Sequence, residues 1–273
     1  MIELPESLVL ASQIRSTLIG KTITDVIVNA SPHKFAFFSL DADRYPSLLI
    51  GKTITDANSY GGQLEVVLGD MKLYFGDGAC PHYVPAGESL PEKHQLLLQF
   101  TDKSALYVSI AMYGMMYLLT EENQRSPYID IAMKKPSPLS DDFDLEYFKS
   151  IIAACPDNLS AKAMLATEQR IPGLGNGCLQ DILFFAKIHP KRKKATIGDE
   201  QINDLYASIR ATLRKMADQG GRASEKDLFG SNGGYIPILY AKTVGTACPA
   251  CSATILKEAY LGGSITFCPH CQK

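Results

Sequence analysis

Apolar residues recur at two spacings along this chain, and the change of spacing separates its two halves. Near the start, Leu10, Ile14 and Leu18 repeat every four residues between Pro5 and Gly20, which predicts one short helix. From there to about residue 120, short β-branched stretches alternate with turn residues, which favours an antiparallel sandwich or barrel. Strands are expected at Thr22–Val28, Leu64–Leu68, Leu73–Phe75, Leu96–Phe100, Leu106–Ile110 and Met115–Leu119.

Helical spacing returns after residues 134–142, a stretch rich in proline and charge that is typical of a connection between domains. Apolar residues there fall on one face of each segment, as expected for helices that pack on a core. The chain is therefore expected to have an α+β fold, and its 273 residues suit at least two domains. Helices are predicted at Asp144–Cys155, Leu159–Glu168, Asn176–Lys187 and Asp199–Gln219.

The hexapeptide Gly-Lys-Thr-Ile-Thr-Asp occurs twice, at Gly20–Asp25 and at Gly51–Asp56. A phosphate-binding loop would need a glycine five residues before each Gly-Lys pair, where Arg15 and Pro46 stand instead. We interpret the repeat as the matching starts of two strands.

Four cysteines close the chain as two Cys-x-x-Cys pairs, Cys248 with Cys251 and Cys268 with Cys271. This spacing is typical of a structural zinc ribbon, the alternatives being two redox pairs or four unpaired thiols. Because the protein would fill all four positions around Zn²⁺, no position remains for a catalytic water. The segments Ile255–Ala259 and Ser264–Phe267 are expected to form a hairpin that turns through Gly262-Gly263.

Basic charge gathers in the second half of the chain. Residues 1–140 carry 11 Lys and Arg against 15 Asp and Glu, whereas residues 158–273 carry 15 against 9. Such a distribution suits a part that meets a polyanion, although a solvated basic face would give the same count. As a group, the candidates for phosphate contact are Lys162, Arg170, Lys191, Arg192, Lys193 and Lys194.

Cysteine usage and hydropathy bear on the location of the protein. The count of seven cysteines is odd and fits a reducing compartment better than a disulfide framework. No apolar run reaches about 18 residues, and the N-terminal residues do not have the pattern of a signal peptide. We expect a cytoplasmic monomer with no membrane partner.

A glycine-rich turn, Ile171–Gly177, joins the second and third helices of the second half. It is not a dinucleotide fingerprint, because it follows a helix and Cys178 stands where the third glycine would be. Gly173 and Gly175 could instead allow a phosphate to approach the amides of the next helix, with Asn176 as cap or donor. A purely structural tight turn is the alternative.

Several segments together resemble the formamidopyrimidine-DNA glycosylase and endonuclease VIII family, and the resemblance runs from end to end. They are the start Met1-Ile2-Glu3-Leu4-Pro5-Glu6, Pro91–His94, Pro138–Phe143, Gly173–Asn176, Ile188–Pro190, Asp218–Gly221 and the terminal zinc ribbon. The resemblance implies a β-sandwich over residues 1–135, a helix-two-turn-helix DNA-binding domain over 136–240 and a zinc finger over 241–273. It also implies base-excision DNA repair on double-stranded DNA that is damaged or distorted. In such proteins Asn176 and the zinc hairpin would hold phosphates around a nucleotide turned out of the duplex.

The chain departs from this family at the residue that carries the chemistry. Family members attack the sugar with the amine of an N-terminal proline exposed by removal of the initiator methionine, and Ile2 stands there in this sequence. A bulky second residue is expected to hinder removal of Met1. Glu3, the acid partner of the family, is retained and could still move a proton.

Two phosphate-binding cations of the family are also absent. The expected lysine falls within Tyr60–Gln63, and the arginine of the zinc hairpin falls at Gly263. Wedge residues that fill the gap in the base stack would fall near Asp77 and across Ala111–Tyr113, where Met112 and Tyr113 could intercalate.

Four functions are compatible with these residues. The first is a DNA-binding protein in which the amine chemistry is lost or altered. The second is an active DNA glycosylase and AP lyase on oxidised bases, with the α-amine of Met1 or Ile2 as nucleophile and help from Glu3. The third is a glycosylase in which Glu3 activates water and no covalent intermediate forms. The fourth is an RNA or protein interaction module.

Overall fold

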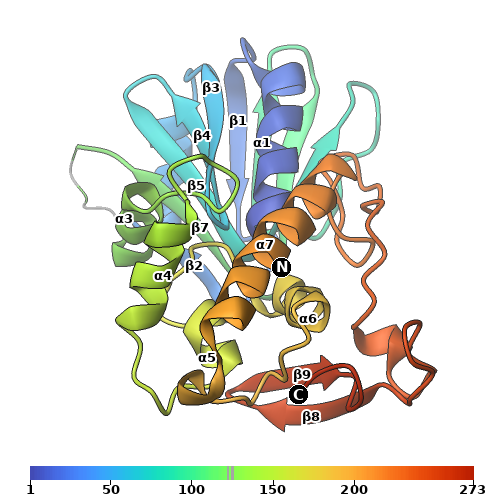
Figure 1. Cartoon of the computed structure of the whole chain (residues 1–273). Helices are drawn as coiled ribbons and strands as arrows, with labels where there is room; N and C mark the ends of the chain where they lie inside the picture. Colours follow the sequence, from blue (N-terminus) through green and yellow to red (C-terminus); the bar gives the residue numbers. More distant parts are fainter. Residues whose placement is uncertain (122, 124–125) are drawn as a thin grey trace.

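The computed structural model describes residues 1–121, 123 and 126–273 of the chain. A β-rich half and a helical half lie one above the other, and a small hairpin lies at the far end of the helical half (Figure 1). The β-rich half consists of α1 (Leu4–Leu18), β1 (Ile23–Val28), β2 (Ala36–Phe38), α2 (Tyr45–Leu49), β3 (Asp56–Tyr60), β4 (Gln63–Leu68), β5 (Met71–Val84), β6 (Leu96–Phe100), β7 (Ala105–Leu119) and α3 (Pro127–Lys134).

The strands form one sheet that closes into a sandwich. Its order is β1-β6-β7-β5-β4-β3, and β2 pairs in parallel with the last part of β7. β5 and β7 are long enough to belong to both layers of the sandwich. Their register shifts between Asp77 and Ala79. Side chains from both edge strands of this order, such as Val26 of β1 and Ala57 of β3, pack into the same core. The predicted sandwich is therefore confirmed.

Two strands predicted separately, Leu106–Ile110 and Met115–Leu119, are one strand in the structure. β7 continues through residues 111–113, which are exposed although they belong to the strand. In the sequence, Gly114 stands just before the second segment, and a glycine between two apolar segments is a turn signal. The sequence pattern also missed β2, α2 and α3, all of which are short and carry few core side chains.

The leading helix forms as predicted. Pro5 lies in its first turn, the side chain of Glu6 accepts a hydrogen bond from the Glu3 backbone N–H at 3.1 Å, and Gly20 follows its end with φ +83°. Its buried face packs against β3 and β4 on one side and reaches α7 (Asp199–Asp218) on the other. α1 therefore links the two halves of the molecule.

The two copies of the hexapeptide pair with each other. Gly20 and Gly51 both have positive φ and end α1 and α2, and the chain then runs into an antiparallel bridge between Thr22 and Thr53. The hydroxyls of these two threonines lie 2.8 Å apart. The copies lead to β1 and β3, as expected for the starts of two strands.

The helical half contains α4 (Leu145–Ala153), α5 (Ala161–Ala166), α6 (Asn176–Phe185) and α7 around a second core. The buried stripe of α7 contains Leu205, Ile209, Leu213 and Met216, as its spacing predicts. Side chains also cross between the halves. Leu4 of α1 lies in the helical core, and Leu228, from the loop after α7, lies in the sandwich core.

The C-terminal hairpin consists of β8 (Leu256–Tyr260) and β9 (Gly263–Phe267) and turns through Leu261 and Gly262. A small core of Phe184, Leu239, Cys248, Ile255 and Cys268 joins it to α6. No helix in the described part of the chain is both long enough and apolar enough to cross a membrane.

Candidate functional site

The carboxylate of Glu3 caps the N-terminus of α6. Its Oε2 accepts hydrogen bonds from the backbone N–H groups of Gly175 at 3.1 Å and Cys178 at 2.9 Å, and its Oε1 accepts one from Gly177 at 2.8 Å. The first amides of a helix have no partner inside the helix and favour an anion. In this structure the anion at these three amides is the protein's own Glu3, which is 4% exposed.

Arg222 completes this buried cluster from the loop after α7. Its guanidinium donates to Glu3 Oε1 at 3.2 Å, to Glu6 at 2.9 and 2.8 Å, and to the Met1 carbonyl oxygen at 3.1 Å. Burial by itself would raise the pKa of Glu6, but the charge and hydrogen bonds of Arg222 outweigh it and hold the pKa below its usual 4.5. The cluster therefore places the two carboxyl groups of Glu3 and Glu6 beside one guanidinium.

The residues around position 2 offer no amine there. The backbone nitrogen of Ile2 is a peptide N–H that donates to the Asp77 carbonyl oxygen at 2.6 Å, and the Ile2 side chain is buried in the sandwich core. The ammonium group of Met1 forms an ion pair with Glu225 at 2.5 Å. Met1 and Glu3 nevertheless line one small cavity, of about 140 Å³.

The glycines of the turn before α6 allow close packing of the two halves. Gly173 has φ +78°, and a Cβ on it would lie 2.4 Å from the Gly61 carbonyl carbon in the β3–β4 turn. A Cβ on Gly175 would lie 2.6 Å from the Glu3 carboxyl carbon. These glycines are thus required by contacts within the protein.

Asn176, the first residue of α6, contacts the C-terminal hairpin. Its Nδ2 donates to the Ser264 carbonyl oxygen at 3.0 Å, and its Oδ1 accepts from Gln180 at 3.1 Å. Gln180 also accepts from the Thr266 backbone N–H at 3.0 Å. The amide is therefore held against β9 at the edge of a cavity of about 150 Å³.

The cations predicted to contact phosphate mostly have partners in the protein. Lys162 is buried and donates to the Tyr260 carbonyl oxygen at 2.8 Å. Arg170 binds the Ala163 carbonyl oxygen and Glu168, Lys191 pairs with Glu258, and Arg192 donates to Gln201. Lys193 is exposed, whereas Lys194 pairs with Asp157. A phosphate bound at any of these paired side chains would share that side chain with its present partner in the protein.

Met112 and Tyr113 lie on β7, at the point where the regular pairing of β5 with β7 is interrupted. Both side chains are exposed, Met112 to 65%, and Gly78 across the strand pair leaves room for the Tyr113 carbonyl oxygen. Asp77 lies beside them with φ +56°. The structure therefore brings the predicted wedge positions together at one bend.

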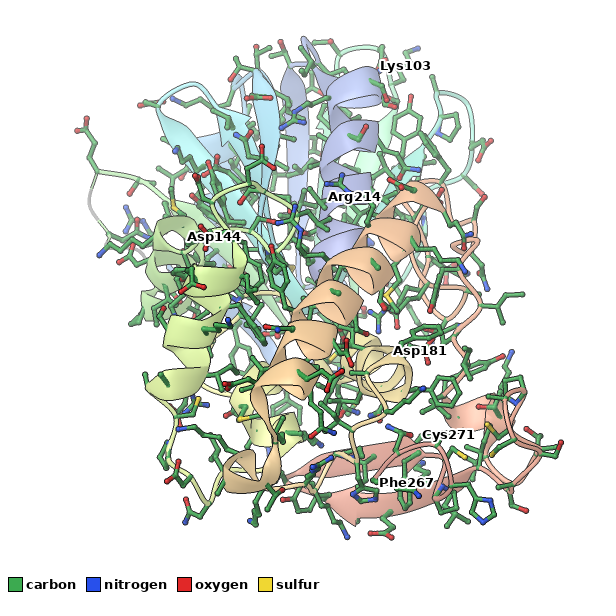
Figure 2. The ribbon with its side chains drawn as sticks, viewed as in Figure 1. Lys103, Asp144, Asp181, Arg214, Phe267 and Cys271 are labelled. Carbon is green, nitrogen blue, oxygen red and sulfur yellow. The ribbon has the colours of Figure 1, made fainter. Side chains whose placement is uncertain are left out.

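The four cysteine sulfurs lie within 4.8 Å of one another. The Cys248 and Cys271 sulfurs are 3.8 Å apart, and those of Cys251 and Cys268 are 3.4 Å apart. Zn–S bonds of about 2.3 Å in a tetrahedron place sulfurs roughly 3.8 Å apart, so the cluster fits a metal ion. Figure 2 shows Cys271 near the hairpin, at the end of the molecule opposite the sandwich.

A buried carboxylate on α6 binds the segment that leads to the four-cysteine cluster. Asp181, labelled in Figure 2, accepts hydrogen bonds from the Tyr235 hydroxyl at 2.8 Å and from the backbone N–H groups of Ile238 at 2.9 Å and Leu239 at 2.8 Å. Burial raises the pKa of Asp181 despite these three donors.

Arg222 and Asp181, which lie in these clusters, and Gln63, which lines the cavity beside Glu3, carry little signal in the sequence and were not predicted as site residues. Arg222 follows a Gly-Gly pair in a loop, and nothing local indicates that its partners lie at positions 3 and 6. Asp181 stands inside an amphipathic helix, where an isolated acidic residue is normally exposed. Gln63 stands out only because it ends the segment where a lysine of the family is expected.

Comparison with known proteins gives the same fold over the whole chain. Residues 135–227 match the formamidopyrimidine-DNA glycosylase H2TH domain. The structure of Lactococcus lactis Fpg in complex with an abasic site containing DNA covers 99% of both chains at 24% identity, with a TM-score of 0.83. The structure of the MutM (Fpg) protein from Thermus thermophilus covers 99% of this chain and 98% of its own, with a TM-score of 0.79 at 23% identity.

Sequence relatives agree with this fold. A formamidopyrimidine-DNA glycosylase of Shouchella clausii is 28% identical over all of this chain and 99% of its own length. One from Carboxydothermus hydrogenoformans is 34% identical, and that match spans 50% of this chain and about half, 53%, of the relative. With the matched H2TH segment, the shared fold and the four-cysteine cluster together, the chain belongs to the formamidopyrimidine-DNA glycosylase and endonuclease VIII family.

Proposed function

We propose that this protein binds double-stranded DNA in the cleft between its halves and has lost the N-terminal amine chemistry of its family. The observation that carries the second part is the buried peptide N–H of Ile2, which donates to Asp77 where the resemblance places a free secondary amine. A covalent step at the sugar needs a nucleophile held in position, and the geometry of such a group tolerates little displacement. DNA binding itself is supported by the likeness to the Lactococcus protein, whose structure is a DNA complex.

The partners of Glu3 support the same proposal. Three backbone N–H groups and Arg222 donate to its two oxygens, so a proton transfer at Glu3 would break contacts that hold α6 and the loop after α7. We infer that Glu3 in this protein joins α1 to α6 and to the loop after α7.

Base-excision assays test this proposal directly. The purified protein would be incubated with duplexes that hold an abasic site, 8-oxoguanine or an oxidised pyrimidine, and binding and product would be measured together. Salt-sensitive binding without product on any duplex is the expected result. Base release or strand cleavage that disappears in Glu3→Gln would overturn it.

A second candidate keeps the family's activity with another nucleophile. It is favoured by one observation: Met1, whose ammonium group pairs with Glu225, lines the same cavity of about 140 Å³ as Glu3. An amine nucleophile would leave an adduct on the protein when an abasic duplex is reduced with borohydride, and intact-mass measurement would detect it. Base release without an adduct would instead indicate water activated by Glu3.

The four-cysteine cluster is proposed to hold Zn²⁺ in a structural role. Thiolates suit this metal, and four protein ligands leave no open position for catalysis. The ion would hold β8 and β9 against α6, where Asn176 meets Ser264. Its role toward DNA would therefore be to keep that hairpin in place.

A further inference from the structure

A small cavity lies at the boundary between the two halves, beside the linker of residues 134–142 that joins them. It has a volume of about 120 Å³, and its wall includes Ser59 and Gly61 of the sandwich, Lys135 and Ser137 of the linker, and Pro172 of the turn before α6. Gly61 and Pro172 are in close contact, because a Cβ on Gly61 would lie 2.7 Å from the Pro172 carbonyl carbon. The cavity therefore adjoins a direct contact between the halves.

Among the described residues, Lys135 is the one charged residue that lines this cavity. Its ammonium group donates to the carbonyl oxygens of Gln169 at 2.7 Å and of Arg170 at 3.4 Å. Both acceptors are neutral, and Lys135 forms no ion pair with a described residue. Because a lysine ammonium group has three N–H donors, one of them remains for a ligand.

The charge of Lys135 is not balanced by a neighbouring carboxylate. Burial and the positive charge of Arg170 lower the pKa of Lys135, and Arg170 itself pairs with Glu168. Lys194, by contrast, is paired with Asp157. A partly buried cation without a carboxylate partner has lost hydration that nothing replaces, so an anion beside Lys135 would be stabilising.

Hydroxyl groups and the size of the cavity indicate which anion would fit. The Oγ of Ser137 accepts a hydrogen bond from the Leu139 backbone N–H at 3.3 Å, and its own O–H has no acceptor among the described residues. Ser59 adds a second hydroxyl, whose Oγ lies 2.5 Å from that of Ser7. At about 30 Å³ for each water, the cavity has room for about four waters, and the four oxygens of a phosphate group would replace them. Lysine is a common phosphate ligand, and hydrogen bonds from charged donors to phosphate are strong.

We propose that this cavity binds a phosphate group, with Lys135 as the cation and Ser137 as a hydroxyl donor. Because the wall contains residues of the sandwich, the linker and the turn before α6, the bound group would stabilise the boundary between the halves. Free inorganic phosphate and a backbone phosphate of bound DNA share the required chemistry. Only the second source rests on the proposed DNA binding.

Thermal unfolding in potassium phosphate and in potassium chloride, at equal pH and ionic strength, tests the site with free phosphate. The melting temperature should rise with phosphate concentration more than with chloride, because a ligand of the folded state stabilises it by mass action. Lys135→Gln should remove this difference. Lys134→Gln is the matched control, because Lys134 is the adjacent lysine, is exposed and does not line the cavity.

The measured quantity is the response to phosphate, so a lower starting stability of a variant does not affect the result. Ser137→Ala keeps every charge and should reduce the response without abolishing it. A general effect of phosphate as an excluded salt would persist in Lys135→Gln, which separates it from binding at this cavity.

Duplex binding at several salt concentrations separates the two sources. If the phosphate belongs to DNA, Lys135→Gln should bind roughly tenfold more weakly than Lys134→Gln, and its slope of log affinity against log salt should be smaller by about one. If the ligand is free phosphate, the two variants should bind DNA equally while only Lys135→Gln loses the response to phosphate. Identical behaviour of the two variants in both experiments would overturn this inference. Absence of DNA binding by the natural protein, with its response to phosphate intact, would refute only the proposed function.

Discussion

Arg222 and Glu6 form a two-point ion pair in the interior: Nε donates to Oε1 at 2.9 Å and Nη2 to Oε2 at 2.8 Å. The backbone N–H of Arg222 adds a third contact, also to Oε1, at 3.0 Å. Glu6 lies in the first turn of α1 and Arg222 in the loop after α7, so the pair joins the two halves. The side chains of Arg222 and Glu6 are only 4% and 5% exposed.

Replacing Arg222 by Met would leave Glu3 and Glu6 as buried carboxylates without a cation. Breaking a buried ion pair by removing one partner costs about 3 to 5 kcal/mol, so the free energy of unfolding should fall by that order. Urea denaturation measures it. Arg222→Lys keeps the charge but not the two-point geometry and should lose less; equal stability of Arg222→Met and the natural protein would contradict this role of the ion pair.

Stability should fall in acid because of Glu6. Its pKa is held below 4.5 in the folded protein, so its contribution is present above 4.5 and is lost as the pH falls through the folded value. Urea unfolding followed from about pH 6 downward would show this decline. In Glu6→Gln the slope below 4.5 should be shallower, and an unchanged slope would rule out Glu6 as its source.

Asp181→Ala should loosen the attachment of the C-terminal hairpin. The change removes the acceptor of the Tyr235 hydroxyl and of two backbone N–H groups, and each unsatisfied buried donor costs about 1 to 3 kcal/mol. Hydrogen exchange at Ile238 and Leu239 should become faster. Asp181→Asn retains one acceptor oxygen and should show a smaller change at the same amides.

Chelation of the metal should unfold the C-terminal unit but leave the sandwich folded. The core of the unit is small and includes Cys248 and Cys268 themselves, so it has little other stabilisation. Metal analysis should find one Zn²⁺ per chain in the purified protein, and Cys268→Ala should abolish it. NMR signals from residues 256–267 should lose dispersion after chelation, whereas those of β4 and β5 should not.

Met112→Ala should weaken binding to an abasic duplex more than binding to a paired duplex. Met112 is 65% exposed, so its loss leaves the fold unchanged, while an apolar wedge fills the gap where a base is missing. Fluorescence anisotropy with both duplexes measures the ratio. Ile236→Ala, at a residue 71% exposed in a different segment, is the control; equal losses on both duplexes would exclude a wedge.

Local patterns predicted much of this structure. The four-residue spacing of Leu10, Ile14 and Leu18 defines α1, because side chains that share a helix face must be about one turn apart. The two Cys-x-x-Cys pairs define the four-sulfur cluster, because short turns bring each pair together. The spacing of ordered motifs also identified the family from end to end.

The tertiary structure alone decided which groups meet at the site. Glu3 and Arg222 are far apart in sequence and come together only when α1 packs between the sheet and α7. Only this packing places a carboxylate at amides of α6 where the glycine turn had indicated a phosphate. Hydrophobic spacing and turn residues report a residue's immediate neighbours along the chain, whereas these contacts depend on how separate elements pack in three dimensions.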